Sequence, residues 1–232
     1  SKIIAGLEPT GHYWFSLGEF LKENNITIAI VNPYHVKQSK ELDDNIQTKN
    51  DSKDPKVIAK LVIEGRYSFP YIPKGIYGEI RATDKLKDSI TKEIISIKNK
   101  IHRWLDIYFP EYKEVYSNIE SKSGLLILKE FALPKNIVEL SSEGIVKRWK
   151  QEKFKAVGLN KAKKLEEAAK KSIGCKNITF SARREIKLLI EDYESKQKHL
   201  ELLNEDLNKL CDEIPMIKEL TKINGIGIGT AV

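Results

Sequence analysis

The chain has 232 residues, of which 41% are hydrophobic and 31% are charged, and 40 Lys and Arg against 33 Asp and Glu give a formal net charge of +7. This length allows one large domain or two small ones, and the high charged fraction favours long solvated helices. Two cysteines exclude a disulfide framework and favour a reducing, cytoplasmic setting. No apolar run is long enough for a membrane span or a signal peptide, so we expect no membrane partner. The excess of positive charge favours a polyanionic partner.

The first seventy residues are predicted to be α/β. Residues 3–7 are a short apolar run typical of a buried strand, and the β-branched residues 26–31 predict a second strand. Between them, apolar residues recur at helical spacing from Tyr13 to Asn24. A strand, a helix and a strand with short joints indicate a βαβ unit with parallel strands. Asn32-Pro33 ends the second strand and leads into a polar stretch, and a further helix is expected from about Asp54 to Gly65.

Two strands do not make a stable parallel sheet, so we expect the rest of the sheet to come from sequence outside this chain or from another chain. The sequence starts without Met in what resembles a strand, and its last residues, Gly225 to Val232, end where a helix should begin. We therefore expect a piece of a longer protein.

Two long helices with heptad spacing are predicted after the α/β part. Mostly apolar positions alternate by four and three from residue 76 to residue 108, and again from residue 186 to residue 210, and a proline follows each run. Lys87 and Lys196 interrupt the apolar seams. An antiparallel coiled-coil hairpin within one chain is the simplest arrangement, although self-association of two chains is equally allowed.

Positive charge is concentrated in the short helices and loops predicted between the two long helices, at 117–180. Residues 144–187 contain 14 Lys and Arg but only 4 Asp and Glu, and they include Trp149 and Phe154. This pattern favours contact with a phosphate backbone, although a solvated charged face is the alternative. The candidate contacts are Lys147, Arg148, Lys150, Lys153, Lys155, Lys161, Lys163, Lys164, Lys170 and Lys171.

Three carboxylates in the α/β part could hold a metal ion. Glu8 follows the first strand, at the sheet edge where sites gather in open α/β folds, and Asp51 and Asp54 are spaced to share one face of a helix. Three carboxylates brought together require a hard cation such as Mg²⁺, which can promote phosphoryl transfer. In the alternative interpretation, Asp54 before Pro55 is only a helix N-cap and Glu8 is a solvated turn residue.

Several motifs, in one order, resemble the DEDD insertion-sequence transposases, a family that includes the Piv-type DNA invertases. The similar segments cover nearly the whole chain. They are Gly6 to Trp14, Val31-Asn32-Pro33, Lys49 to Asp54, Leu105 to Tyr112, and Ile223 to Gly227.

The resemblance implies a partial RNase H-like (RuvC-like) catalytic domain with four acidic ligands for Mg²⁺ or Mn²⁺. The family's glutamate corresponds to Glu8, and its last two aspartates correspond to Asp51 and Asp54, as metal ligands and catalytic residues. The first aspartate and the catalytic serine have no counterpart here, so we expect this piece to be inactive although its parent recombines DNA. The resemblance also implies a structured bridge RNA as a second partner.

The tail carries a separate nucleic-acid signal. Gly225 and Gly227, among apolar residues, fit a helix-hairpin-helix pattern, in which a glycine turn offers backbone N–H groups to a phosphate. An ordinary glycine-rich loop is the alternative.

Together, these patterns predict an α/β plus mostly α architecture in three parts. Residues 1–73 would be a partial RNase H-like domain, residues 74–215 a coiled-coil hairpin with a basic helical insert, and residues 216–232 the start of a C-terminal transposase domain. One predicted function is a transposase that cleaves and transfers DNA strands. The other is a non-catalytic coiled-coil dimerisation and nucleic-acid-binding module. Both predict self-association into a homo-oligomer through the coiled coil.

Overall fold

The computed structural model describes residues 3–9, 11–44, 54–155, 157–220 and 222–225. The chain divides into two compact units, Ser1–Pro73 and Lys74–Val232. Most of the described residues are helical, and one small parallel sheet lies in the N-terminal unit. No helix in the described part of the chain is both long and apolar enough to cross a bilayer.

The N-terminal unit is built on two parallel strands. Ile4 lies opposite Thr27 and Leu7 opposite Ile30, and the Val31 amide continues the ladder by donating to the Leu7 carbonyl at 2.9 Å. The predicted βαβ arrangement of these strands is confirmed. The elements of this unit are β1 (Ile4–Leu7), α1 (Tyr13–Glu23), β2 (Thr27–Ile30), α2 (Pro33–Asp44) and α3 (Asp54–Ile63).

The sequence interpretation missed α2. Asn32-Pro33 ends β2, but it also begins this helix, because the Asn32 side-chain oxygen accepts a hydrogen bond from the Tyr34 amide at 2.9 Å. Proline at the first helical position needs no amide partner, so the pair forms a helix start. Val36 then turns into the core with Val57 and Leu61 of α3, which explains how a mostly polar segment is held as a helix.

Two features of the N-terminal unit depart from simple burial of apolar residues. Gly6 in β1 packs so closely against α3 that an added Cβ would lie 2.8 Å from Ile58 Cγ2. On α1, by contrast, the buried position is Gly18, while Leu17 and Phe20 are 45% and 58% exposed. The apolar spacing of α1 therefore predicted the helix, but its apolar face is largely uncovered in this unit.

The second unit consists of helices. Two of them, α4 and α9, have 33 residues each. Short helices lie between these two in the sequence. The elements are α4 (Ile76–Tyr108), α5 (Tyr112–Val115), α6 (Lys122–Phe131), α7 (Pro134–Gln151), α8 (Leu159–Lys170), α9 (Phe180–Asp212) and α10 (Pro215–Leu220).

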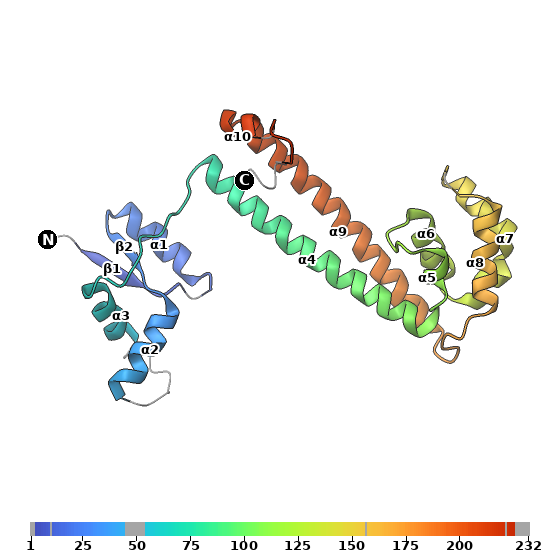
Figure 1. Cartoon of the computed structure of the whole chain (residues 1–232), viewed down its shortest axis with the longest axis horizontal. Helices are drawn as coiled ribbons and strands as arrows, with labels where there is room; N and C mark the ends of the chain where they lie inside the picture. The colour runs from blue at the N-terminus through green and yellow to red at the C-terminus, as the bar shows by residue number, and fades with distance from the viewer. Residues whose placement is uncertain (1–2, 10, 45–53, 156, 221, 226–232) are drawn as a thin grey trace. The chain divides into compact units, whose positions relative to one another are not determined.

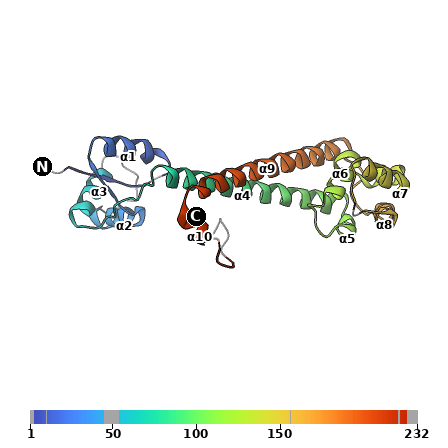
Figure 2. The same ribbon diagram turned by 90° about the horizontal axis from the view of Figure 1, so that it is seen from above.

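Helices α4 and α9 lie side by side and run in opposite directions (Figures 1 and 2). Near one end, the Trp104 indole N–H donates to the Ala182 carbonyl at 2.9 Å. In the middle, Glu93 pairs with Lys196 at 2.5 Å, and at the other end Ile80 packs in a cluster with Leu207. Residue numbers rise along α4 while those of the contacting residues fall along α9, so the two helices are antiparallel. Their apolar seam is therefore covered within one chain.

The short helices α5 to α8 continue the same core. Trp149 of α7 is 1% exposed, and its indole N–H donates to the Ser123 carbonyl at 3.0 Å. Helix α7 is kinked at Ser141, where the backbone has a φ of 61°. The next amide, of Ser142, donates a hydrogen bond to Glu166 Oε2 of α8 at 2.8 Å. Trp104 and Trp149, the largest fully buried side chains among the described residues, thus belong to this helical core.

A buried tyrosine pair provides a test of this core. Burial raises the pKa of Tyr112 well above its ordinary value, and burial also raises the pKa of Tyr116 to about 12 although its hydrogen bond with Ser123 opposes this. The Tyr112 hydroxyl has no hydrogen-bond partner. We expect Tyr112→Phe to raise the free energy of unfolding by about 1 kcal/mol, because it removes an unpaired buried hydroxyl.

The pH dependence gives the matching control. Both folded-state pKa values lie above the unfolded value, so the stability due to neutral Tyr112 and Tyr116 is full below about pH 10 and falls as pH rises above it. Tyr112→Phe should therefore lose less stability above pH 10 than the parent chain. Tyr116→Phe should instead lose stability at neutral pH. Urea titrations at pH 7 and at alkaline pH measure both, and a destabilised Tyr112→Phe chain at pH 7 would contradict the packing described.

Candidate metal and nucleic-acid sites

Glu8 lies where a catalytic carboxylate of an open α/β sheet is expected. It directly follows β1, and the parallel pairing places the carboxyl end of β1 beside that of β2. The residue is half-buried and interacts with its surroundings. The pairing of β1 with β2 thus positions the backbone from which the Glu8 side chain extends.

Asp54 lies in the first turn of α3, and its carboxylate forms an ion pair with Lys40 of α2. The Oδ1 atom is inaccessible to solvent, so this carboxylate faces a cation in a partly buried position. An acidic group in the first turn also interacts favourably with the helix dipole. Sequence reasoning missed Lys40, because the helix that carries it was not predicted.

Asp51 lies outside the described residues, so the proposed grouping of Glu8, Asp51 and Asp54 stays a prediction. Among the described residues, no three His, Cys, Asp or Glu side chains form a group that could hold a metal ion. The chemistry of the two described carboxylates nevertheless fits a hard divalent cation, because both offer oxygen ligands and Asp54 already neutralises a positive charge.

The basic residues 144–187 divide into exposed lysines and cations with internal partners. None of the exposed set below is ion-paired with a carboxylate that the structure describes, so their charge is available to a polyanion. They include Lys147, Lys150, Lys153, Lys155, Lys163, Lys164, Lys171 and Lys176.

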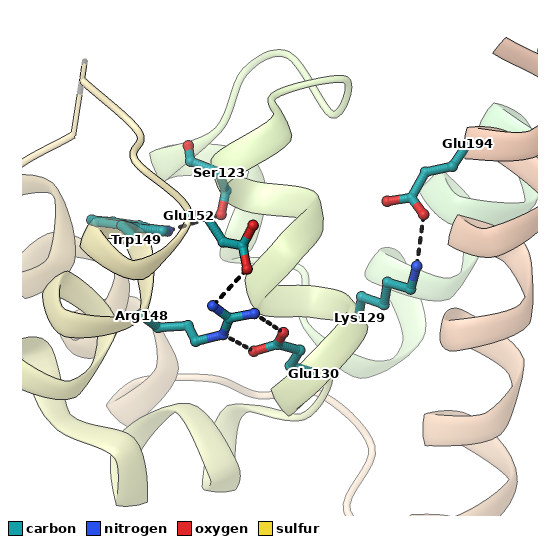
Figure 3. Close-up of polar contacts among 7 residues, drawn as sticks. All are labelled: Ser123, Lys129, Glu130, Arg148, Trp149, Glu152 and Glu194. Carbon is teal, nitrogen blue, oxygen red and sulfur yellow. Dashed lines mark hydrogen bonds and ion pairs between the residues drawn. The ribbon is translucent and has the colours of Figure 1, made fainter. Parts of the chain in front are cut away.

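Arg148 belongs to the second group (Figure 3). Its Nε and Nη2 atoms donate to the two carboxylate oxygens of Glu130 at 2.6 Å each, and Nη1 donates to Glu152 at 2.8 Å. The hydrogen bonds that Arg148 donates to Glu130, and then those to Glu152, raise the pKa of Arg148 above its ordinary value. The residue thus joins α6 to α7, and Lys129 similarly joins α6 to Glu194 of α9 at 2.6 Å.

Lys161 and Lys170 also have partners inside the helical unit. The Lys161 ammonium lies 4.0 Å from the centre of the Tyr116 ring, a cation–π contact. Lys170 pairs with Glu166 at 2.6 Å, and the hydrogen bond from Lys170, followed by those from Ser142, lowers the pKa of Glu166. Trp149 is buried, so it is not available to stack on a base.

Comparison with known proteins identifies the N-terminal part of the chain. Residues 1–110 match the family model DEDD_Tnp_IS110, which is described as a transposase. These residues are a DEDD_Tnp_IS110 transposase domain. No curated protein matches the chain. The predicted family resemblance is therefore confirmed for residues 1–110, which include Glu8, Asp51, Asp54 and all of α4.

The described end of the chain shows one half of the predicted glycine turn. Gly225 has a φ of +93°, a left-handed conformation that glycine adopts readily and that suits a tight turn after α10. Gly227 lies outside the described residues. The helix-hairpin-helix interpretation stays a prediction.

Substitutions of the neighbouring residues Arg148 and Lys147 should have opposite effects on thermal stability and on the salt dependence of nucleic-acid binding. Arg148→Gln breaks the bonds to Glu130 and Glu152, so we expect a lower midpoint of thermal unfolding with little change in the salt dependence of nucleic-acid binding. Lys147→Gln should leave the midpoint unchanged and reduce the salt slope by about one if it removes one phosphate contact. Filter binding over a salt series and thermal melts of both variants check this. A reduced slope in Arg148→Gln with an unchanged midpoint would contradict the structural role.

Proposed function

We propose that the transposase domain cleaves and transfers DNA strands with a divalent cation held by Glu8, Asp51 and Asp54. The observation that carries this proposal is the family match over residues 1–110, which spans all three carboxylates. The parallel β1–β2 pair, with Glu8 at its carboxyl end, would be part of an RNase H-like sheet.

The carboxylates would act together with Lys40. Mg²⁺ or Mn²⁺, when bound, would polarise a phosphate oxygen and activate the attacking nucleophile. The β1–β2 ladder would fix Glu8, and α3 would present Asp54 at its first turn. Lys40 neutralises Asp54 in the structure described, so its ammonium would have to leave this carboxylate and could then face a phosphate.

The helical unit would bind nucleic acid. Its exposed lysines on α7 and α8 support salt-dependent contact with DNA, the substrate of a transposase, and with a structured bridge RNA. The antiparallel α4–α9 pair would serve as a coiled-coil hairpin that carries this basic surface.

Self-association would use a surface other than the α4–α9 seam, which is covered within the chain. The exposed apolar side chains of α1, including Tyr13 at 80% and Phe20 at 58%, are the surface that supports it. A monomer by light scattering at micromolar concentration would contradict a homo-oligomer.

The ion pair between Asp54 and Lys40 supports a second candidate function, a non-catalytic coiled-coil and nucleic-acid-binding module. In that case Asp54 would serve only to join α3 to α2. The two functions differ in a strand-transfer assay of the complete transposase. Loss of transfer in Asp51→Ala with binding kept supports catalysis, whereas unchanged transfer supports the module.

A metal titration tests the proposed site in the chain itself. We expect saturable Mn²⁺ binding by calorimetry, weakened at least about tenfold in Glu8→Gln and Asp54→Asn, because even an orienting partner of a metal ligand contributes that much. Asparagine keeps the helix start intact. Glu205→Gln, an exposed position on α9, is the matched control and should bind as the parent does. Equal affinity in all four proteins would rule out Glu8 and Asp54 as ligands.

A further inference from the structure

A pocket of about 540 Å³ lies in the helical unit, where the end of α4, the start of α7, the end of α8 and the α8–α9 loop meet. Its volume is within the roughly 300–1,000 Å³ typical of small-ligand sites. We name it the loop pocket. Its lining includes Tyr108, Leu133, Lys135, Lys170, Cys175 and Lys176.

The loop that closes the pocket is held firmly against the end of α4. The Cys175 amide donates to the Ile107 carbonyl at 2.8 Å, and the Ile173 amide donates to Glu111 Oε1 at 2.9 Å. Gly174 packs so closely that an added Cβ would lie 2.0 Å from the Tyr108 carbonyl oxygen. These contacts hold the loop in place as one wall of the pocket, so the pocket is already formed in the absence of a ligand.

Hydrogen bonding keeps the anchoring carboxylate ionised. Burial alone would raise the pKa of Glu111, but hydrogen bonds from Ser172 and from the Ile173 amide outweigh burial, and the pKa of Glu111 is lowered. At neutral pH the loop is therefore tied to a charged acceptor, which forms stronger hydrogen bonds than a neutral one.

The lining combines apolar walls with a cationic rim. Leu133 and Ala169 are 5% exposed and Tyr108 is half-buried, so the walls are largely apolar with one aromatic ring. The lining also carries the ammonium groups of Lys135, Lys170 and Lys176 against a single carboxylate, that of Glu139.

The rim cations are not fully neutralised. Lys135 lies 3.9 Å from Glu139 with 85% of its side chain exposed, and Lys170 pairs with Glu166. Lys176 is exposed and is not ion-paired with any carboxylate in the described part of the chain. An apolar space with a positive rim matches a planar apolar group attached to negative charge. Part of the lining, from Ala169 to Thr179, belongs to residues 144–187, which have 14 basic and 4 acidic residues. The chemistry is that of a nucleic-acid base with its flanking phosphates.

We infer that the loop pocket receives one unpaired base of a nucleic-acid chain, with the flanking phosphates at Lys135, Lys170 and Lys176. This inference rests on the proposed function, because it takes nucleic acid as the partner of the helical unit. A base enters such a pocket only after it leaves its stack, so single strands and loops should bind there in preference to a duplex.

Cys175 reports directly on occupancy of the pocket. Its residue is exposed and lines the pocket, whereas Cys211, the other cysteine of the chain, is buried at 2% exposure. In the full chain, the rate at which a maleimide modifies Cys175 should fall about tenfold when a single-stranded oligonucleotide is present at ten times its Kd, because only the free pocket reacts. A duplex at the same bound fraction should protect much less.

The reverse experiment blocks the pocket. Attaching a bulky maleimide to Cys175 should weaken single-strand binding about tenfold or more, while a Cys175→Ser chain taken through the same reaction keeps its affinity. Lys176→Gln should lower the salt slope of single-strand binding by about one.

The outcomes separate this inference from the proposed function. Salt-dependent oligonucleotide binding with unprotected Cys175, and equal affinity after alkylation, would overturn the pocket but leave nucleic-acid binding in place. Absence of any oligonucleotide binding would overturn both. Protection that appears on raising the chain concentration without nucleic acid would assign the pocket to a second copy of the chain and overturn the inference.

Discussion

The antiparallel contact between α4 and α9 is the constraint on which the helical unit depends. The Trp104 indole reaches the Ala182 carbonyl across 78 positions of sequence, in a buried hydrogen bond at 2.9 Å. Because the chain must leave α4 and return at the start of α9, the described residues between these helices are confined to one end of the pair. That confinement brings the α8–α9 loop onto the end of α4, where Cys175 and Gly174 meet Ile107 and Tyr108.

Local pairing decides which of the positive charges can act on a partner. The formal positive charge of residues 144–187 is high, yet Arg148 is paired with Glu130 and Glu152, and the Lys161 ammonium lies over the Tyr116 ring. Such charges hold α5, α6, α7 and α8 together and contribute less to long-range attraction of a polyanion. The lysines that remain exposed, such as Lys163 and Lys164 on α8, define the face that a phosphate backbone would meet.

The periodic spacing of apolar residues made the two long helices predictable from the sequence. Features that depend on contacts between residues far apart in the sequence could not be predicted. The heptad of α4 gave its bounds, because apolar positions every three and four residues face one partner along the whole helix. Helix α2 was missed because its start depends on one hydrogen bond from the Tyr34 amide to the Asn32 side chain, and Val36 is the buried apolar residue among the described side chains of this helix. The partner Lys40 of Asp54 and the partner Glu130 of Arg148 follow only from the fold, since no local spacing links them.

A distance measurement between α4 and α9 tests the account most directly. Spin labels at Glu93→Cys and Lys196→Cys, in a chain that also carries Cys175→Ser, would replace a pair whose charged atoms lie 2.5 Å apart. The account predicts one short distance by pulsed electron paramagnetic resonance that survives dilution with an excess of unlabelled chain. A short distance that disappears on dilution would show that the helices pair between chains, and it would contradict the fold from which the loop pocket and the basic surface are built.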